Sequence, residues 1–201
     1  MGFQEFVLEK GEKGLIFSSG MAAISSSLFS NLESGDHVVF QNDLYGGTRN
    51  FIKKQFPKYG IEFSFSLGLE VLDFERELKP NTVGIYIETP SNPLFKIIDL
   101  RKVSHLAKDN KCWTIVDNTF ASPVNQNPIK FGIDMVVHSA TKYLGGHSDI
   151  SAGAVVSNNF FIDKIYDHAK NFGGNLSEFS TWLLERSIKT VFLRVEAQNR
   201  N

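Results

Sequence analysis

Short apolar runs recur along the chain, and amphipathic segments separate them. The apolar runs predict strands at 14–18, 36–41, 61–65, 82–88, 113–117, 134–139 and 152–157. The amphipathic segments predict helices at 3–10, 21–31, 48–59 with an interruption at Pro57, and 100–110. Strands with little internal alternation that are separated by helices indicate a mixed, mostly parallel sheet sandwiched by helices. The pattern therefore predicts the α/β class.

A helical pattern also runs from Ser177 to Asn201 and reaches the last residue without a cap. Its apolar positions include Trp182, Ile188 and Val195. A chain that stops inside an amphipathic helix is expected to be truncated. The pattern therefore separates residues 1–176 from a terminal helical segment at 177–201.

The composition is that of an ordinary globular protein. Among 201 residues, 42% are hydrophobic, and 21 Lys and Arg against 22 Asp and Glu leave a net charge of −1. Balanced charge gives no global attraction to nucleic acid or to an anionic membrane. No apolar run approaches the roughly 20 residues that span a bilayer, and we expect no secretory signal. The single cysteine, Cys112, excludes an internal disulfide framework, so a cytoplasmic protein is expected.

Sheets of this kind bind ligands beyond the carboxyl ends of their strands, so the polar residues after each apolar run are the first candidates. Ser18-Ser19-Gly20 lies at a strand-to-helix turn. Small residues there leave backbone N–H groups facing the helix N-terminus, where a phosphate binds favourably. The competing interpretation is an ordinary helix cap.

The segment 137–147 is a second candidate. Ser139 and Thr141 are two positions apart, so in an extended segment their hydroxyls face one side and can share a phosphate. Lys142 follows directly, before a Gly-Gly turn. A lysine partly withdrawn from water becomes a usable amine nucleophile. The alternative is a solvated loop lysine, and the apolar residues at 135–137 argue against it.

Asp117 and Tyr45 are further candidates. Asp117 ends an apolar strand, where a buried carboxylate needs a partner; a pyridinium N–H and a helix N-cap both satisfy that need. Tyr45 lies on the turn at 42–48, which contains two glycines. A tyrosine there is either a half-buried surface aromatic or a side chain that stacks on a flat heterocycle and uses its hydroxyl on a proton.

Together and in this order, these segments resemble the Cys/Met-metabolism family of pyridoxal-phosphate (PLP) enzymes, which includes cystathionine γ-synthase, cystathionine γ-lyase, methionine γ-lyase and the homoserine sulfhydrylases. The motifs at 139–149 and 88–93 carry the resemblance, which extends from about Leu8 to Asn201. It implies the PLP-dependent transferase fold of the aspartate-aminotransferase type I and a homo-oligomer, either a dimer or a tetramer. It also implies that 1–176 is the PLP-binding large domain and that 177–201 begins the helical connection to a C-terminal small domain, which is expected to be absent.

The resemblance also implies pyridoxal 5′-phosphate as the cofactor. Lys142 matches the lysine that holds it as an internal aldimine and removes the α-proton, and Tyr45 matches the tyrosine that stacks on the ring and carries a proton. These two residues are the expected catalytic pair. The other expected cofactor contacts are the backbone N–H groups of Gly20 and Met21 and the side chains of Asn92, Asp117, Thr119, Ser139 and Thr141.

The implied reaction is γ-elimination or γ-replacement on cystathionine or homoserine esters. Gly47 stands where methionine γ-lyases carry a cysteine, which favours the cystathionine γ-synthase and γ-lyase group. An O-acylhomoserine sulfhydrylase or a methionine γ-lyase is the alternative within the family. Metal binding is not expected, because His138, His147 and His168 lack metal-ligand spacing.

Two features of the family are expected to lie outside the chain. One is the N-terminal Tyr-x-Arg arm that reaches a neighbouring subunit's phosphate. The other is the arginine of the C-terminal domain that binds the substrate carboxylate. The alternative hypothesis is therefore a non-catalytic remnant that keeps the PLP-binding fold.

Overall fold

The computed structural model of the protein describes residues 5–201, in which the strands form one mixed sheet. The strands are β1 (Lys13–Phe17), β2 (His37–Phe40), β3 (Glu62–Phe65), β4 (Thr82–Glu88), β5 (Trp113–Asp117), β6 (Met135–His138) and β7 (Gly153–Ser157). Their order is β1-β7-β6-β5-β4-β2-β3. Neighbours from β3 to β6 pair in parallel, whereas β7 pairs antiparallel with both β6 and β1. The predicted mixed, mostly parallel sheet is confirmed.

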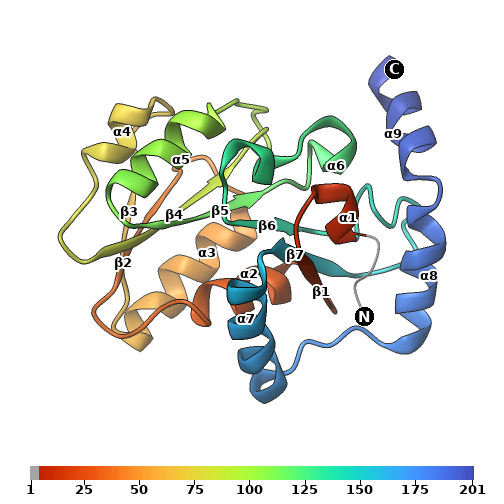
Figure 1. The fold of residues 1–201 in the computed structure, drawn as a ribbon, viewed down its shortest axis with the longest axis horizontal. Helices are drawn as coiled ribbons and strands as arrows, with labels where there is room; N and C mark the ends of the chain where they lie inside the picture. The colour runs from red at the N-terminus through yellow and green to blue at the C-terminus, as the bar shows by residue number, and fades with distance from the viewer. Residues whose placement is uncertain (1–4) are drawn as a thin grey trace.

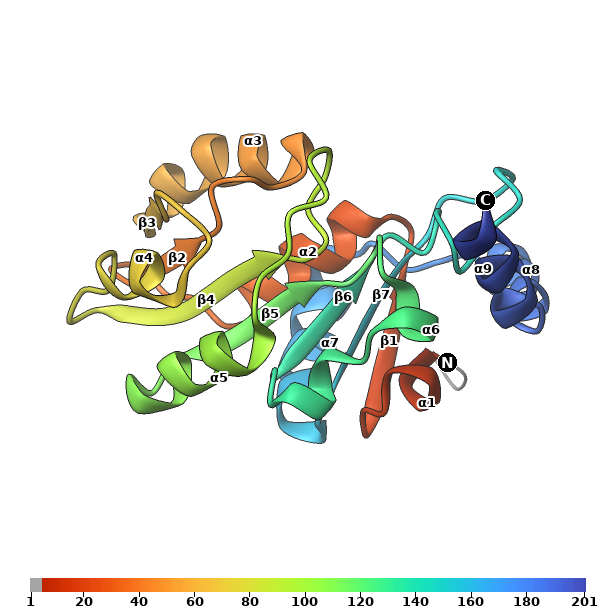
Figure 2. The same ribbon diagram turned by 90° about the horizontal axis from the view of Figure 1, so that it is seen from above.

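Helices cover both faces of this sheet. They are α1 (Glu5–Glu9), α2 (Gly20–Phe29), α3 (Gly46–Gln55), α4 (Val71–Glu75), α5 (Leu100–Asp109), α6 (Ser122–Asn125), α7 (Asn159–Phe172), α8 (Glu178–Ile188) and α9 (Val191–Arg200), with 3₁₀ turns at Phe56–Tyr59 and Pro128–Phe131. In Figure 1, α4 and α5 lie above the sheet and α2, α3 and α7 lie below it. Figure 2 shows the same arrangement from above, with α3 and α5 on opposite sides of β4.

The alternation of side chains along the strands produces two cores. In β2, Val38 and Phe40 pack with buried residues of α2, α3 and α7, whereas Val39 packs on the opposite face with residues of α4 and α5. All three side chains are fully buried. Successive side chains of a strand point to opposite faces, so a strand that is apolar at every position must be covered on both sides.

A third apolar cluster lies beyond the sheet, where α8 and α9 pack against the segment 140–152. Leu184 and Val191 of these helices are buried against Leu144. The Arg194 guanidinium of α9 donates hydrogen bonds to the carbonyls of Tyr143 (2.7 Å) and Leu144 (3.3 Å). The C-terminal helices therefore support the segment that follows β6.

The helical pattern at 177–201 is two helices rather than one, with a break between Ile188 and Val191. The Ser187 carbonyl near the end of α8 accepts hydrogen bonds from the side chains of Thr190 and Arg194, which replace a continuing helical bond. At 48–59, the predicted interruption at Pro57 is confirmed, because α3 gives way there to a 3₁₀ turn. Proline lacks the N–H group that a continuing helix needs.

The helices α7, α4 and α6 were not predicted from the apolar pattern. Buried positions in α7 follow helical spacing at Ile162, Ile165 and Ala169, and the Asn158 side chain caps the helix by accepting from the Phe161 N–H at 3.1 Å. Exposed Phe160 obscures this apolar stripe. The helical signal was present, but it was mixed with exposed aromatics.

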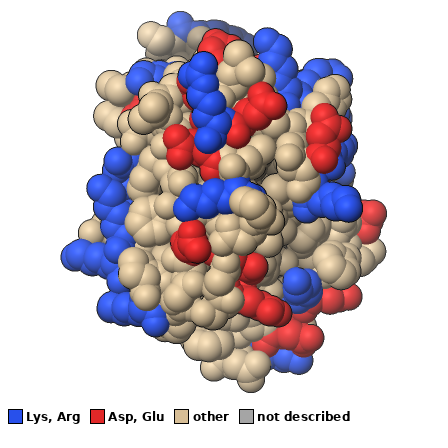
Figure 3. Space-filling model, turned by 90° about the vertical axis from the view of Figure 1, so that its left-hand side faces the viewer, with Lys and Arg blue, Asp and Glu red and all other residues tan. Residues whose placement is uncertain are grey.

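The described surface carries charge of both signs. Figure 3, which faces the β3 edge of the sheet, shows basic and acidic side chains interspersed with uncharged atoms. None of the helices within residues 5–201 is long and apolar enough to cross a membrane.

We expect Gly153→Ala to destabilise the fold by about 1–3 kcal/mol, as overpacking does. A Cβ atom at Gly153 would lie 2.1 Å from the Ser19 carbonyl oxygen, so the backbone of the turn before α2 would have to move. Urea denaturation measures the change.

Gly46→Ala is the matched control, because a Cβ atom at Gly46 would meet nothing within 4 Å. Its unfolding free energy should stay within about 0.5 kcal/mol of the unsubstituted protein, as for most surface changes. Equal losses in both variants would contradict close packing of β7 on the Ser19 turn.

Candidate active site

A cavity of about 280 Å³ lies beyond the carboxyl ends of β1, β2, β4, β5 and β6. Its lining contains all nine residues that the sequence predicts for the site, namely Gly20, Met21, Tyr45, Asn92, Asp117, Thr119, Ser139, Thr141 and Lys142. It also contains Ser19, Ile24, Glu88 and Phe120. Because the five strands run in the same direction, their polar ends meet at one edge of the sheet.

The N-terminus of α2 forms one wall of the cavity. Ser19 caps the helix, its hydroxyl accepting the Ala22 N–H at 3.1 Å. The N–H groups of a helix's first turn have no acceptor within the helix, so those of Gly20 and Met21 are available to an anion. A Cβ atom at Gly20 would lie 2.9 Å from the Ser139 Cβ. Glycine is therefore needed for the turn to approach Ser139 closely.

The hydroxyl groups that line the cavity beside this helix N-terminus already form hydrogen bonds with the backbone. Thr119 Oγ1 accepts the Ser139 N–H at 2.8 Å, which joins the ends of β5 and β6. Thr141 Oγ1 accepts the Ala152 N–H at 3.0 Å and lies 3.1 Å from the Ala152 carbonyl. These contacts hold Ser139 and Thr141 beside the α2 N-terminus, where hydroxyls and N–H groups can bind one anion.

Asp117 supplies a buried carboxylate at the end of β5, with 6% of its surface exposed. Burial raises the pKa of Asp117, while hydrogen bonds from Thr119 and the nearby His138 oppose the shift. Its Oδ1 accepts the Thr119 N–H at 3.0 Å. Since α6 begins only at Ser122, the carboxylate is not that helix's N-cap, and its presence in the cavity favours a cationic ligand group.

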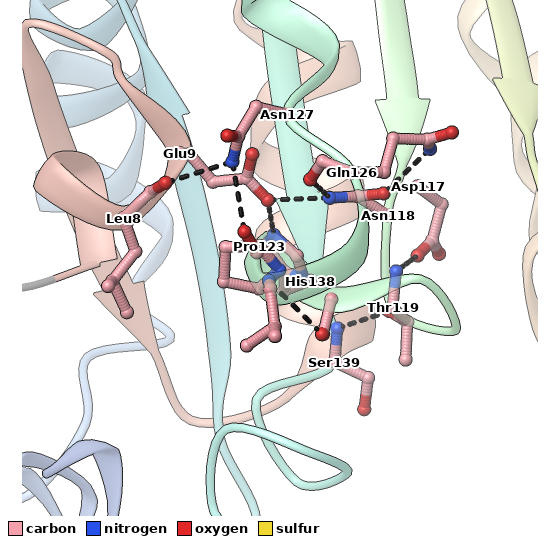
Figure 4. Close-up of polar contacts among 12 residues, drawn as sticks. Leu8, Glu9, Asp117, Asn118, Thr119, Pro123, Gln126, Asn127, His138 and Ser139 are labelled. Carbon is pink, nitrogen blue, oxygen red and sulfur yellow. Dashed lines mark hydrogen bonds and ion pairs between the residues drawn. The ribbon is translucent and has the colours of Figure 1, made fainter. Parts of the chain in front are cut away.

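A buried polar cluster lies beside Asp117 and Ser139 (Figure 4). Glu9 Oε1 lies 2.6 Å from His138 Nε2 and accepts the Asn118 side-chain N–H, also at 2.6 Å. Both members of the Glu9–His138 pair are at most 2% exposed. Because Asn118 follows Asp117 and His138 precedes Ser139 in the chain, this cluster ties α1 to the two strand ends that carry site residues.

Tyr45 and Asn92 line the cavity from two separate turns. The Tyr45 backbone occupies the position before α3, and its ring lies over Gly47, where a Cβ atom would come within 2.4 Å of the ring. The backbone N–H groups of Tyr45 and Asn92 both donate to the Glu88 carboxylate, at 2.8 and 2.6 Å. Burial and the neighbouring Asp117 raise the pKa of Glu88 to about 8.

Lys142 differs from the sequence-based expectation in its exposure. It lines the cavity as predicted, but it is an exposed residue rather than one withdrawn from water. It lies in the turn after β6, where its N–H donates to the Ser139 carbonyl at 3.0 Å. The cavity thus combines an amine, an anion-binding wall and buried carboxylates, a set suited to a phosphorylated ligand with a carbonyl and a basic ring nitrogen.

Sequence reasoning assigned no role to Glu88, Phe120 and Ile24, which also line the cavity. Glu88 could have been found, because it is a charged residue at the end of a β-branched run. Phe120 stacks on Phe95 with ring centroids 5.2 Å apart, a contact between distant segments that no local pattern encodes. Within residues 5–201, no cluster of His, Cys, Asp or Glu could hold a metal ion.

We expect Glu9→Ala to lower the unfolding free energy by about 3–5 kcal/mol, as when one partner of a buried pair is removed. The substitution leaves His138 and Asn118 without their shared acceptor. Asp163→Asn, in the exposed Lys13–Asp163 pair, is the control and should cost at most about 1 kcal/mol. Urea denaturation compares the two, and a Glu9→Ala loss no larger than the control's would show that the buried pair contributes nothing.

We expect Glu88 to make the stability of the ligand-free chain fall as pH rises from about 5 to 8, with a contribution of at most about 1.4 kcal/mol per pH unit. The pKa of Glu88 is raised from 4.5 to about 8. Between these values the folded state holds a proton that the unfolded state has lost, so rising pH favours unfolding. Urea titrations across this range measure the slope.

Glu88→Gln should remove that contribution to the slope. Glu62→Gln is the control and should leave the slope unchanged, because Lys79 lowers the pKa of Glu62 and this residue titrates below the range. If Glu88→Gln kept the full slope, another group would be responsible.

Comparison with known proteins matches this architecture. Residues 5–201 match the profile of the family described as Cys/Met metabolism PLP-dependent enzyme. A cystathionine gamma-lyase from Bacillus subtilis (strain 168) is 47% identical over 195 residues, 96% of this chain and 51% of that protein. A cystathionine beta-lyase from Lactococcus lactis subsp. cremoris (strain MG1363) is 44% identical over 197 residues, 96% of this chain and 51% of that protein.

A solved structure shows the same fold. The crystal structure of cystathionine gamma-lyase from Lactobacillus plantarum complexed with L-serine matches this chain with a TM-score of 0.89 at 40% identity. The match covers 93% of this chain and 49% of the chain in that structure. The chain therefore spans about half the length of these relatives. The predicted PLP-dependent transferase fold is confirmed. Since the family profile extends over all the described residues, the chain belongs to the Cys/Met metabolism family of PLP-dependent enzymes.

Proposed function

We propose that this chain is the cofactor-binding part of a PLP-dependent enzyme of the cystathionine γ-synthase and γ-lyase type, which acts on cystathionine or homoserine esters. The observation that carries the proposal is the convergence of an amine, a buried carboxylate and an anion-binding helix N-terminus on one cavity. The substrate class is taken from the named relatives, which are cystathionine lyases.

The residues around the cavity fit pyridoxal phosphate. A side chain at position 20 would fill the space beside Ser139. Gly20 leaves this space open, and it suits a phosphate. The buried Asp117 carboxylate suits a ring N–H, since burying it is costly without a partner. Lys142 provides the amine for a covalent bond to the aldehyde carbon. The Tyr45 ring lines the same space and suits stacking on a heterocycle.

When bound, pyridoxal phosphate supplies an electron sink for a negative charge that develops beside the amino group of the substrate. Asp117 would hold the ring nitrogen through its carboxylate and keep that nitrogen protonated. Lys142 would take the α-proton of the substrate on its Nζ atom. Tyr45 would donate a proton from its hydroxyl to the leaving group, and Asn92 would orient the substrate carboxylate.

We further propose a homo-oligomer located in the cytoplasm. Large apolar side chains on the C-terminal helices are exposed, as Phe179 and Leu193 are at 70% each, and burying them against another copy would be favourable. A single buried cysteine suits a reducing compartment.

We expect Lys142→Ala to abolish the visible absorbance that the protein gains on binding pyridoxal phosphate through its lysine. The reason is that the covalent bond needs the Lys142 amine. Lys53→Ala is the control, because Lys53 lies on α3 and does not line the cavity. The measurement is an absorbance scan of each protein after added cofactor and gel filtration.

A band retained by both variants would mean that another lysine holds the cofactor. If the unsubstituted chain binds the cofactor but does not turn over cystathionine, or O-acyl-homoserine with cysteine, the result favours the non-catalytic remnant. If the chain cleaves the Cβ–S bond of cystathionine and not the Cγ–S bond, it would be assigned to the β-lyases.

A further inference from the structure

Glu88 is the least expected member of the cavity lining. It is the last residue of β4, it is 5% exposed, and it lies opposite Asp117 in the register of β4 and β5. Two carboxyl groups are thus buried on neighbouring strands at the edge of the site. Such a pair is electrostatically unfavourable, so the burial of Glu88 beside Asp117 requires an explanation.

The reason lies in the hydrogen bonds of Glu88. Its Oε2 accepts the Tyr45 backbone N–H at 2.8 Å, and its Oε1 accepts the Asn92 backbone N–H at 2.6 Å. The Glu88 N–H in turn donates to Gln41 Oε1 at 2.8 Å. One side chain therefore connects the turn after β2 with the turn after β4, and it does so through the backbones of two residues that line the cavity.

A carboxyl group is the side chain that these contacts require. Both of its oxygens accept hydrogen bonds, whereas glutamine has one acceptor oxygen and an NH₂ group that would face an N–H donor. Leaving a buried N–H without an acceptor is costly. Among the described residues, the Tyr45 N–H donates to the Glu88 carboxylate and to no other acceptor.

We propose that Glu88 is a positioning residue, which holds the Tyr45 ring and the Asn92 side chain over the cavity by accepting the backbone N–H groups of both. The inference rests on the proposed function, because it assigns Glu88 to the placement of the ring-stacking tyrosine. Glu88 makes no contact with the reacting atoms in this role.

The same two turns are joined a second time outside the cavity, which provides a matched control. The Ser91 hydroxyl donates to Asp43 Oδ2 at 2.7 Å. Asp43 Oδ2 also forms a longer ion pair with Lys96 Nζ, at 3.8 Å. Neither Asp43 nor Ser91 lines the cavity. If any bridge between the turns were sufficient, loss of the outer one would have the same effect as loss of Glu88.

The first test uses the cofactor-free chain and amide hydrogen exchange measured by NMR. Glu88→Gln should reduce the protection of at least one of the Tyr45 and Asn92 N–H groups by about tenfold or more, the loss expected when a buried N–H group loses its acceptor. Asp43→Asn should leave both protected. Glu88→Asp, whose shorter side chain cannot span both donors, should behave like Glu88→Gln and covers the case in which one variant fails to fold.

The second test measures the affinity for pyridoxal phosphate and the circular dichroism of its visible band. Glu88→Gln should weaken binding about 10- to 100-fold and change the dichroism, which reports the asymmetric surroundings of the ring. Asp43→Asn should change the affinity by less than about threefold. In a Tyr45→Ala background, Glu88→Gln should lose most of its effect, because residues that act through one another are not additive.

The outcomes separate the two proposals. Unchanged amide protection in Glu88→Gln, or effects of Glu88 and Tyr45 that simply add, would overturn the positioning role. Absence of cofactor binding by the unsubstituted chain would overturn the proposed function, whereas the exchange experiment would still decide whether Glu88 holds the two turns.

Discussion

The site depends on the direction of the strands. β2, β4, β5 and β6 run in parallel, and β1 has the same direction because two antiparallel pairings with β7 separate it from β6. The polar turns that follow these strands therefore emerge at one edge. Residues more than a hundred positions apart, such as Gly20 and Ser139, come into contact there. An alternating up-and-down arrangement of the same strands would divide them between two edges.

Buried carboxyl groups set the geometry at that edge, each in a different way. Glu9 binds the side chains of Asn118 and His138, which adjoin Asp117 and Ser139 in the chain, and Glu88 binds the backbones of the turns after β2 and β4. Asp117 lines the cavity, and its Oδ1 accepts the Thr119 N–H. Buried carboxyl groups destabilise a fold unless hydrogen-bond donors surround them. Their concentration at this edge indicates that the fold is less stable than it could be and that the site residues are held in place as a result.

The C-terminal helices contribute to the site from a distance. Arg194 on α9 donates to two carbonyls directly after Lys142, and buried residues of α8 and α9 pack on the same segment. The segment 140–152 has little regular structure of its own. The helices α8 and α9 thus supply the segment around Lys142 with hydrogen bonds and packing that its own irregular backbone does not provide.

The sequence by itself determined the strands and the sheet class, and it identified nine of the thirteen residues that line the cavity. The strands and the ligand edge follow from local properties: apolar runs mark buried strands, and polar or small residues at their ends mark the ligand edge. Asn92 was identified only through the resemblance to a known family. Tertiary structure alone decided what has no local signature. The Glu9–His138 pair spans 129 positions and the Tyr45–Glu88 bond spans 43, so neither could be predicted from spacing. The exposure of Lys142 is another such property, because it depends on how neighbouring segments surround the turn and not on the apolar residues that precede it.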